Sequence, residues 1–123
     1  MVQAAVEVLE PESVTAESGA IDRVHLSRIT FNDRGLEREV LQLFDRQAEL
    51  LMGRIHRSEP AAVATLAHTL KGSAIGIGAG PVARAAASAE LIASNGLGDC
   101  EHAIRQLAQA VEEARAQIAA LLR

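Results

Sequence analysis

Apolar residues recur at helical spacing along most of the chain. Three stripes return every three or four residues, as the buried side of a helix does. They are Leu36, Val40, Leu43, Phe44, Leu51 and Ile55; then Val63, Leu66, Ala67, Leu70, Ala74 and Ile77; then Ile104, Leu107, Val111, Ile118 and Leu121. No segment alternates apolar and polar residues as a half-buried strand does. The pattern therefore predicts helices and no strands.

Residues that cap or restart helices set the boundaries in the first half of the chain. A short helix is expected over Ile21–Ile29. In the turn that follows, Asn32 or Asp33 can serve as the N-cap of the first long helix. Ser58 is expected to cap the next helix, because Pro60 fits only the first turn.

Glycines and a proline set the boundaries in the second half. Gly78 and Gly80 are expected to end the second long helix, and Pro81 to open a third that runs to about Ser94. Asp99 is the expected cap of the last helix. We therefore predict an all-α fold, an antiparallel up-down four-helix bundle with a short extra N-terminal helix, in which the last two helices form a hairpin that extends past the others.

The first residues differ from the rest. Residues 1–19 mix short apolar groups with Glu, Ser, Pro and Gly and keep no steady period, so we expect a flexible N-terminal tail. The remaining residues, 20–123, are expected to form one domain, which suits a chain of 123 residues.

Composition narrows the classes of protein. The net charge of −4 is spread over the chain without a basic stripe, which argues against nucleic acid as a partner. A single cysteine, Cys100, excludes a disulfide framework. The other histidines, His25, His56 and His102, are scattered and expected to face solvent, so no metal site is expected. Without a long apolar run or a signal peptide, we expect a monomeric, cytoplasmic protein that does not contact a membrane.

One helix carries a histidine, His68, that lies off the apolar stripe. Its neighbours on the same face are small, apolar or basic: Ala61, Ala64, Thr65, Lys71, Gly72 and Ile75. A glycine inside a helix costs about 1 kcal/mol relative to alanine. Gly72 is thus expected to leave room for another surface, with Ala64, Thr65 and Ile75 as further docking residues.

The glycines after His68 do not form a phosphate-binding loop. Such a loop follows a strand and places its lysine after the glycines, whereas Lys71 precedes Gly72, Gly76, Gly78 and Gly80 here. The last three glycines are better explained as a frayed helix end before Pro81.

The chemistry that suits an exposed histidine is nucleophilic. A neutral imidazole has one nitrogen with a free lone pair, and an imidazole of ordinary pKa, about 6.5, is mostly neutral near pH 7. Lys71 can pair with an anionic group carried on the ring of His68. A carboxylate that holds the other ring nitrogen would select the tautomer, and Glu90, which stands among alanines on the next helix, can supply it.

The segment "AHTLKGSAIGIGAGPVARAAASAE" resembles the core motif of the histidine-containing phosphotransfer (HPt) domains of bacterial phosphorelays. That family has roughly the pattern H-x-L-K-G-[SA]-[SA]-x-x-[LI]-G-[AL], with Glu or Gln 22 residues after the histidine. The matching positions are His68, Leu70, Lys71, Gly72, Ser73, Ala74, Ile77, Gly78, Ala79 and Glu90. Upstream, "GLEREVLQLF" resembles the family's preceding helix, whereas Gly76 and Pro81 depart from its usual residues.

The resemblance implies a phosphorelay intermediate without kinase activity of its own. His68 would accept a phosphoryl group from an aspartate of a response-regulator receiver domain and pass it to another. Lys71 would steady the phosphoryl charge, Gly72 would leave docking room and Glu90 would orient the ring. No cofactor is implied for this chain, since Mg²⁺ is expected on the receiver only; a hybrid histidine kinase is a further candidate partner.

Two alternative functions involve a histidine on an exposed helix face. The dimerisation helix of a histidine kinase has an acidic residue directly after its histidine, whereas Thr69 and Leu70 follow His68, so this class is disfavoured. A non-catalytic helical adaptor, which binds a signalling partner through the small-residue face around His68, stays open.

Overall fold

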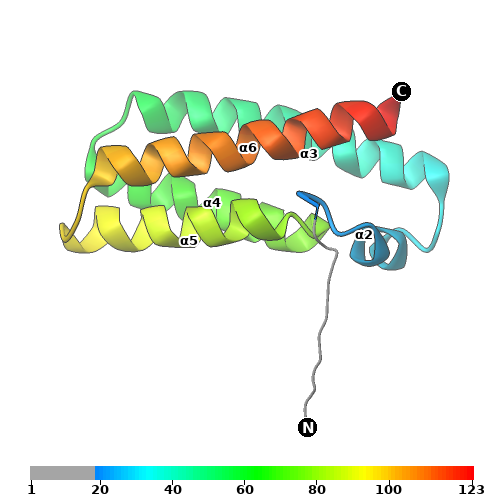
Figure 1. Ribbon diagram of the computed structural model, residues 1–123, viewed down its shortest axis with the longest axis horizontal. Coiled ribbons are helices and arrows are strands. Elements are labelled where there is room, and N and C mark those ends of the chain that lie inside the picture. The colour runs from blue at the N-terminus through cyan, green and yellow to red at the C-terminus, as the bar shows by residue number, and fades with distance from the viewer. Residues whose placement is uncertain (1–18) are drawn as a thin grey trace, which may run out of the picture.

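The computed structural model describes residues 19–123, and all regular secondary structure in that part of the chain is helical (Figure 1). The helices are α2 (Arg23–Ile29), α3 (Arg34–His56), α4 (Pro60–Ile77), α5 (Gly80–Asn95) and α6 (Cys100–Leu122). The prediction of an all-α fold is confirmed. The tail expected at residues 1–19 lies outside the described residues, except for Gly19.

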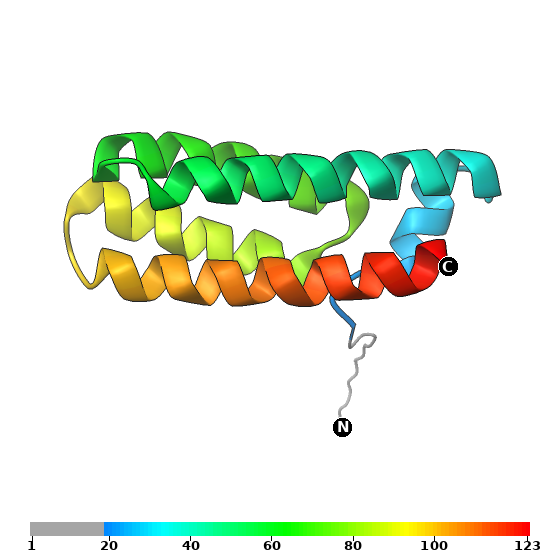
Figure 2. The same cartoon turned by 90° about the horizontal axis from the view of Figure 1, so that it is seen from above.

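The four long helices pack around a common core. Contacts join α3 to α4, α4 to α5, α5 to α6, and α6 back to α3. In Figures 1 and 2, successive long helices run in opposite directions, and the short α2 lies at one end of the bundle. The expectation that the last two helices extend furthest is wrong. The longest helices are α3 and α6, with 23 residues each, while α5 has 16. Helices α3 and α6 extend past α4 and α5 at the end where α2 lies (Figure 2).

Aspartates begin three of the helices. The side chains of Asp22, Asp33 and Asp99 each accept a hydrogen bond of 3.0 Å from the backbone N–H three residues further on. These bonds satisfy one of the unpaired N–H groups of a helix start. Asp33, and not Asn32, is therefore the cap of α3.

Ser58 does not cap α4. Its hydroxyl donates to the carbonyl of Arg54 at 2.6 Å, so that it closes the end of α3. Glu59 occupies the N-cap position of α4 without a side-chain hydrogen bond, and Pro60 follows at the first position. A proline there lacks only an N–H that would be unpaired in any case, which explains why α4 starts without a polar cap.

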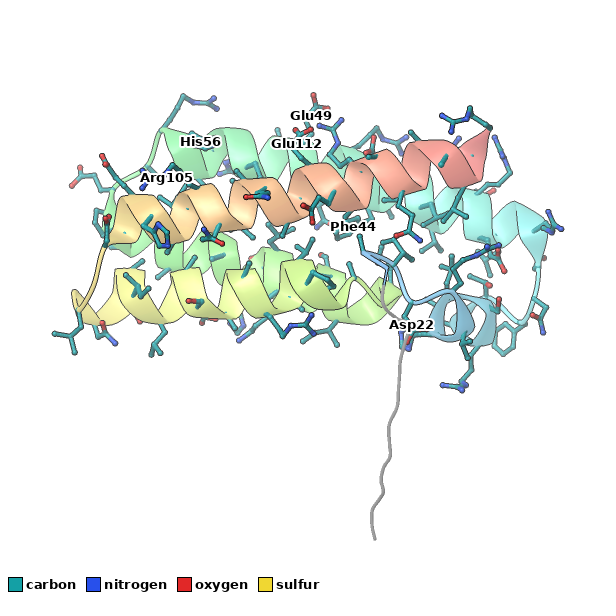
Figure 3. All side chains as sticks on the ribbon, in the orientation of Figure 1. Asp22, Phe44, Glu49, His56, Arg105 and Glu112 are labelled. Atoms are coloured by element: carbon teal, nitrogen blue, oxygen red, sulfur yellow. The ribbon has the colours of Figure 1, made fainter. Side chains whose placement is uncertain are left out.

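The core is aliphatic and rich in alanine. Fully buried residues include Ala48, Ile55, Val63, Ala67, Leu70, Ala74, Val82, Ala86, Ala89, Leu107 and Ala114. Side chains this small let helices approach closely. Charged side chains such as Glu49 and Glu112 lie on the outside of the bundle (Figure 3), where Arg115 also joins α6 to α3 through an ion pair of 2.8 Å with Asp45.

The predicted stripe of α3 mixed residues from two faces of the helix. Leu36 and Leu43 are exposed, and the buried residues of α3 are Leu41, Phe44, Ala48, Leu51, Met52 and Ile55. The prediction was wrong for these two leucines because α3 has apolar side chains on two sides, and periodicity does not say which side is covered.

The glycines at the end of α4 form an ordered junction with α2. The helix stays regular to Ile77, and Gly78 closes it with φ of 85°. The carbonyl of Gly78 accepts a hydrogen bond of 2.8 Å from the backbone N–H of Asp22. His25 is half-buried, and its Nε2 donates to the carbonyl of Gly76 at 2.9 Å. The expectations of a frayed helix end and of a solvent-facing His25 are therefore wrong.

Candidate functional site

His68 projects from the outer surface of α4. Its side chain is 66% exposed, whereas Ala67 and Leu70 beside it in the sequence are fully buried. One turn of α4 thus holds the core on one side and presents the imidazole to solvent on the other. This is the position expected for a histidine that lies off the apolar stripe.

Glu90 on α5 contacts two of the predicted site residues, His68 and Lys71, which both lie on α4. One of its carboxylate oxygens, Oε2, lies 2.9 Å from Nδ1 of His68, and Oε1 accepts a hydrogen bond of 2.9 Å from Nζ of Lys71. The close packing of α4 against α5 brings together residues that are 22 and 19 positions apart in the sequence. The structure thus joins the three residues that the sequence analysis selected.

The carboxylate determines which nitrogen of His68 carries the proton. The hydrogen bond from Lys71 lowers the pKa of Glu90, desolvation partly opposes this effect, and the hydrogen bond from His68 adds to it. An ionised carboxylate can only accept hydrogen bonds, so Nδ1 of His68 must be the donor. A neutral ring protonated at Nδ1 has its lone pair on Nε2. Among the residues that the structure describes, none hydrogen-bonds to Nε2, and this nitrogen is available to an external electrophile.

The residues proposed for docking surround His68 unequally. Gly72 is exposed, and apart from its chain neighbours and the adjacent helix backbone no atom lies within 4 Å of the position that a Cβ would take. Ile75 is 59% exposed, which is unusual for a large apolar side chain. Thr65 is exposed as well, but Ala64 is half-buried and packs against the core. Of the four residues predicted for docking, Gly72, Ile75 and Thr65 are therefore exposed, and Ala64 is not.

Two features of the site were not found from the sequence. Lys71 binds Glu90 in the free protein, whereas the sequence analysis paired it with an anionic group on the ring of His68 and did not predict this contact. Leu91, directly after Glu90, is largely exposed and adds apolar surface. The sequence could have indicated Leu91, because it is a large aliphatic residue within an alanine-rich segment.

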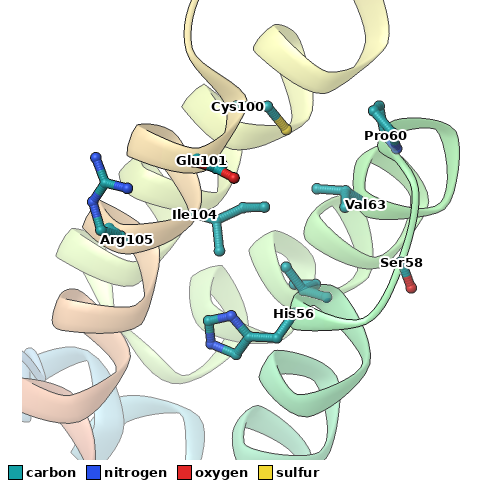
Figure 4. Close-up of a pocket in the computed structure, with 9 residues that line it drawn as sticks. His56, Ser58, Pro60, Val63, Cys100, Glu101, Ile104 and Arg105 are labelled. Atoms are coloured by element: carbon teal, nitrogen blue, oxygen red, sulfur yellow. The ribbon is translucent and has the colours of Figure 1, made fainter.

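A cavity of about 430 Å³ lies elsewhere, where the end of α3, the start of α4 and the start of α6 meet (Figure 4). Ile55, Val63 and Ile104 contribute apolar lining, and His56 and Arg105 contribute polar groups. None of the predicted site residues lines it. Cys100, also on its wall, is half-buried with a free thiol.

The described residues offer no other obvious chemical centre. Within residues 19–123, no three His, Cys, Asp or Glu side chains come together as a metal site would require. In the same part of the chain, no helix combines the length and apolar character needed to cross a membrane.

Comparison with known proteins agrees with the motif around His68. A family model described as the Hpt domain matches residues 36–117, which is more than half of the chain. Among solved structures, the chain is similar to a rice protein that carries the description of a histidine-containing phosphotransfer protein. The identity is 21%, the TM-score is 0.74, and the match covers 85% of this chain and 80% of the rice chain, which shows a shared fold. No curated protein sequence matches the chain. The chain belongs to the Hpt domain family, and its role is histidine phosphotransfer.

Proposed function

We propose that this protein is a phosphorelay intermediate that carries a phosphoryl group on Nε2 of His68. The group comes from an aspartyl phosphate of a receiver domain and passes to an aspartate of another receiver domain. The observation that carries this proposal is the arrangement of the ring, with Nδ1 bound by Glu90 and Nε2 open to solvent.

The transfer needs little from this chain beyond a positioned nucleophile. The lone pair of Nε2 attacks phosphorus, the N–P bond forms, and the bond from phosphorus to the aspartate oxygen breaks, which releases a carboxylate. The ring then gains positive charge while Nδ1 keeps its proton. The carboxylate of Glu90 at 2.9 Å stabilises that charge. The receiver supplies the aspartate and the Mg²⁺ that neutralises the phosphoryl oxygens.

Lys71 and Gly72 assist the same step in different ways. The ammonium of Lys71, one turn along α4 from His68, can turn from Glu90 toward the phosphoryl oxygens once they are present. Gly72 leaves open space beside the imidazole, which lets a receiver surface approach. Ile75 offers that surface an apolar contact.

The test is phosphoryl transfer from a phosphorylated receiver domain to the full chain in the presence of Mg²⁺. The label on the wild-type protein should be acid-labile and base-stable, as a phosphoramidate is. His68→Gln should take up no label while its circular dichroism stays unchanged, because the side chain is exposed and off the core. His102→Gln, an exposed histidine on α6, is the matched control and should be labelled normally.

Two results would contradict the proposed phosphotransfer. Label on His68→Gln would place the acceptor at another residue and overturn the proposal. A receiver that binds the wild-type chain without transferring phosphate would favour the helical adaptor.

A further inference from the structure

Helix α3 has a second apolar surface that faces away from the core. Leu36, Leu43 and Leu50 are 37%, 60% and 63% exposed. Residues seven positions apart on a helix return to within about 20° of one another, so the three leucines form one line along about 21 Å of the helix. We call this line the leucine stripe. In Figure 2, α3 runs along one side of the bundle and α6 along the other.

Helix α6, which is as long as α3, shows that a long helix in this bundle does not need a second apolar surface. Helix α6 also has 23 residues and also packs against two other long helices. Its exposed positions nevertheless hold charged residues, glutamine, histidine and alanine, and its large apolar side chains are buried or half-buried. Exposed leucines at a regular interval along α3 therefore need a separate explanation.

Two leucines of the stripe, Leu43 and Leu50, are complementary to each other when two α3 helices run antiparallel. Consider a twofold axis that passes between Arg46 and Gln47. Leu43 is three residues before Arg46, and Leu50 is three residues after Gln47. The symmetry therefore places Leu43 of each copy opposite Leu50 of the other, so that the same contact forms twice.

The charges on the same face agree with this register. Glu39 is seven residues before Arg46, and Arg54 is seven residues after Gln47, so each meets its opposite charge in the second copy. Both residues are exposed and lie close to the stripe in helical angle. A parallel pairing in register would instead place Glu39 against Glu39 and Arg54 against Arg54. Charge complementarity thus selects the antiparallel arrangement.

We propose that the leucine stripe is a homodimer interface, in which the α3 helices of two copies of this chain pack antiparallel about a twofold axis. The occupant of this face is a second copy, which departs from the monomer expected from the sequence. His68 lies on α4 and is not part of the stripe, so both imidazoles stay available for transfer. The proposal does not depend on the proposed function.

The experiment is analytical ultracentrifugation of the full chain over a wide range of concentration. The mass should rise from 13.0 kDa toward twice that value. The double variant Leu43→Glu/Leu50→Glu should stay monomeric, since it would bury four carboxylates at the interface. Leu97→Glu, an exposed leucine between α5 and α6, is the matched control and should dimerise like the wild type. A wild-type chain that is monomeric at every concentration, or a double variant that still dimerises, overturns the proposal.

A second set of variants tests the register without changing any apolar residue. Glu39→Arg and Arg54→Glu should each weaken dimerisation about tenfold, because each change turns two attractive pairs into repulsive ones. The combined variant Glu39→Arg/Arg54→Glu should regain the wild-type dissociation constant. Failure of the combined variant to recover would contradict the antiparallel pairing. All three variants should transfer phosphate as the wild type does.

Discussion

Oε2 of Glu90 lies 2.9 Å from Nδ1 of His68, although 22 residues separate the two in the sequence. This relationship places the proton on Nδ1 of His68 and leaves the lone pair on Nε2. The same carboxylate holds Lys71 through its other oxygen. One side chain of α5 therefore contacts both His68 and Lys71 of α4.

Replacing Glu90 by alanine should slow phosphoryl transfer by up to about tenfold, the effect of one lost hydrogen bond that orients the ring. The ring of His68 would rotate more freely and sample both neutral tautomers. Nuclear magnetic resonance of the imidazole nitrogens would report the tautomer, and stopped-flow measurement would report the rate. An unaltered rate together with an unaltered tautomer would show that Glu90 has no role in orienting the ring.

Replacing Lys71 by alanine should slow transfer about tenfold or more without abolishing it, because a charge-assisted contact to a phosphoryl oxygen is lost. Lys71→Arg keeps the charge and should recover part of the rate. Lys71 is the only lysine in the chain, so ¹⁵N-lysine labelling yields a single side-chain signal. That signal should shift when His68 is phosphorylated. If it does not, the ammonium stays on Glu90 and does not touch the phosphoryl group.

Replacing Gly72 by glutamine should block transfer from a receiver and leave the fold intact. Apart from its chain neighbours and the adjacent helix backbone, no atom lies within 4 Å of the new Cβ, so the variant should be as stable as the wild type or up to about 1 kcal/mol more stable. Phosphorylation of His68 by a small phosphoramidate should be much less affected, since a small donor needs less room. Normal transfer from the receiver would mean that docking uses another surface.

A matched control for the helix effect is Gly53→Ala on α3. Gly53 also lies inside a helix, and a Cβ there would make only an ordinary contact of 3.6 Å with Arg57. This variant should gain similar stability with no change in transfer. If Gly53→Ala also lost transfer, the loss in the Gly72 variant could not be assigned to blocked docking.

Substitution of Gly78 should lower the stability of the fold, in contrast to substitution of Gly72 or Gly53. Its φ is 85°, and a Cβ would meet the side chain of His25 at 3.0 Å and the carbonyl of Asp22 at 3.2 Å. Gly78→Ala should therefore lower the free energy of unfolding by about 1 kcal/mol or more. Urea denaturation measures the loss, and hydrogen exchange should increase in α2 first. Unchanged stability would contradict the tight junction between α2 and α4.

The pair formed by Glu90 and Lys71 should stabilise the fold only above acid pH. The hydrogen bond from Lys71 is the main reason that the pKa of Glu90 is lower in the folded protein than its ordinary value of 4.5. A lowered folded pKa means that the stabilisation is present above about pH 4.5 and is lost as the pH falls through the folded pKa. Denaturation of the wild type and of Glu90→Gln should thus differ at pH 7 and converge in acid. An equal difference at both pH values would rule out an electrostatic origin.

Much of the site is local and could be predicted from the sequence. His68, Lys71 and Gly72 lie within two turns of one helix, so their spacing alone places them close together. Asp99 was correctly predicted as a cap, and Asp33 was one of two predicted candidates, because capping is a contact between neighbours in the sequence. The lack of alternating apolar and polar residues predicted no strands, and the single cysteine excluded a disulfide framework. What the sequence determined by itself was the helix content and the composition of the helix face around His68.

Tertiary packing decided the rest. Glu90 reaches His68 and Lys71 only because α5 packs against α4 in one register, which no local pattern records. Leu36 and Leu43 matched the period of a buried stripe, yet the neighbouring helices cover the side of α3 that carries Leu41 and Phe44. Periodicity measures the angle between side chains on one helix, but burial depends on where other helices lie. A helix with apolar residues on two sides therefore has two possible core faces until its partners select one.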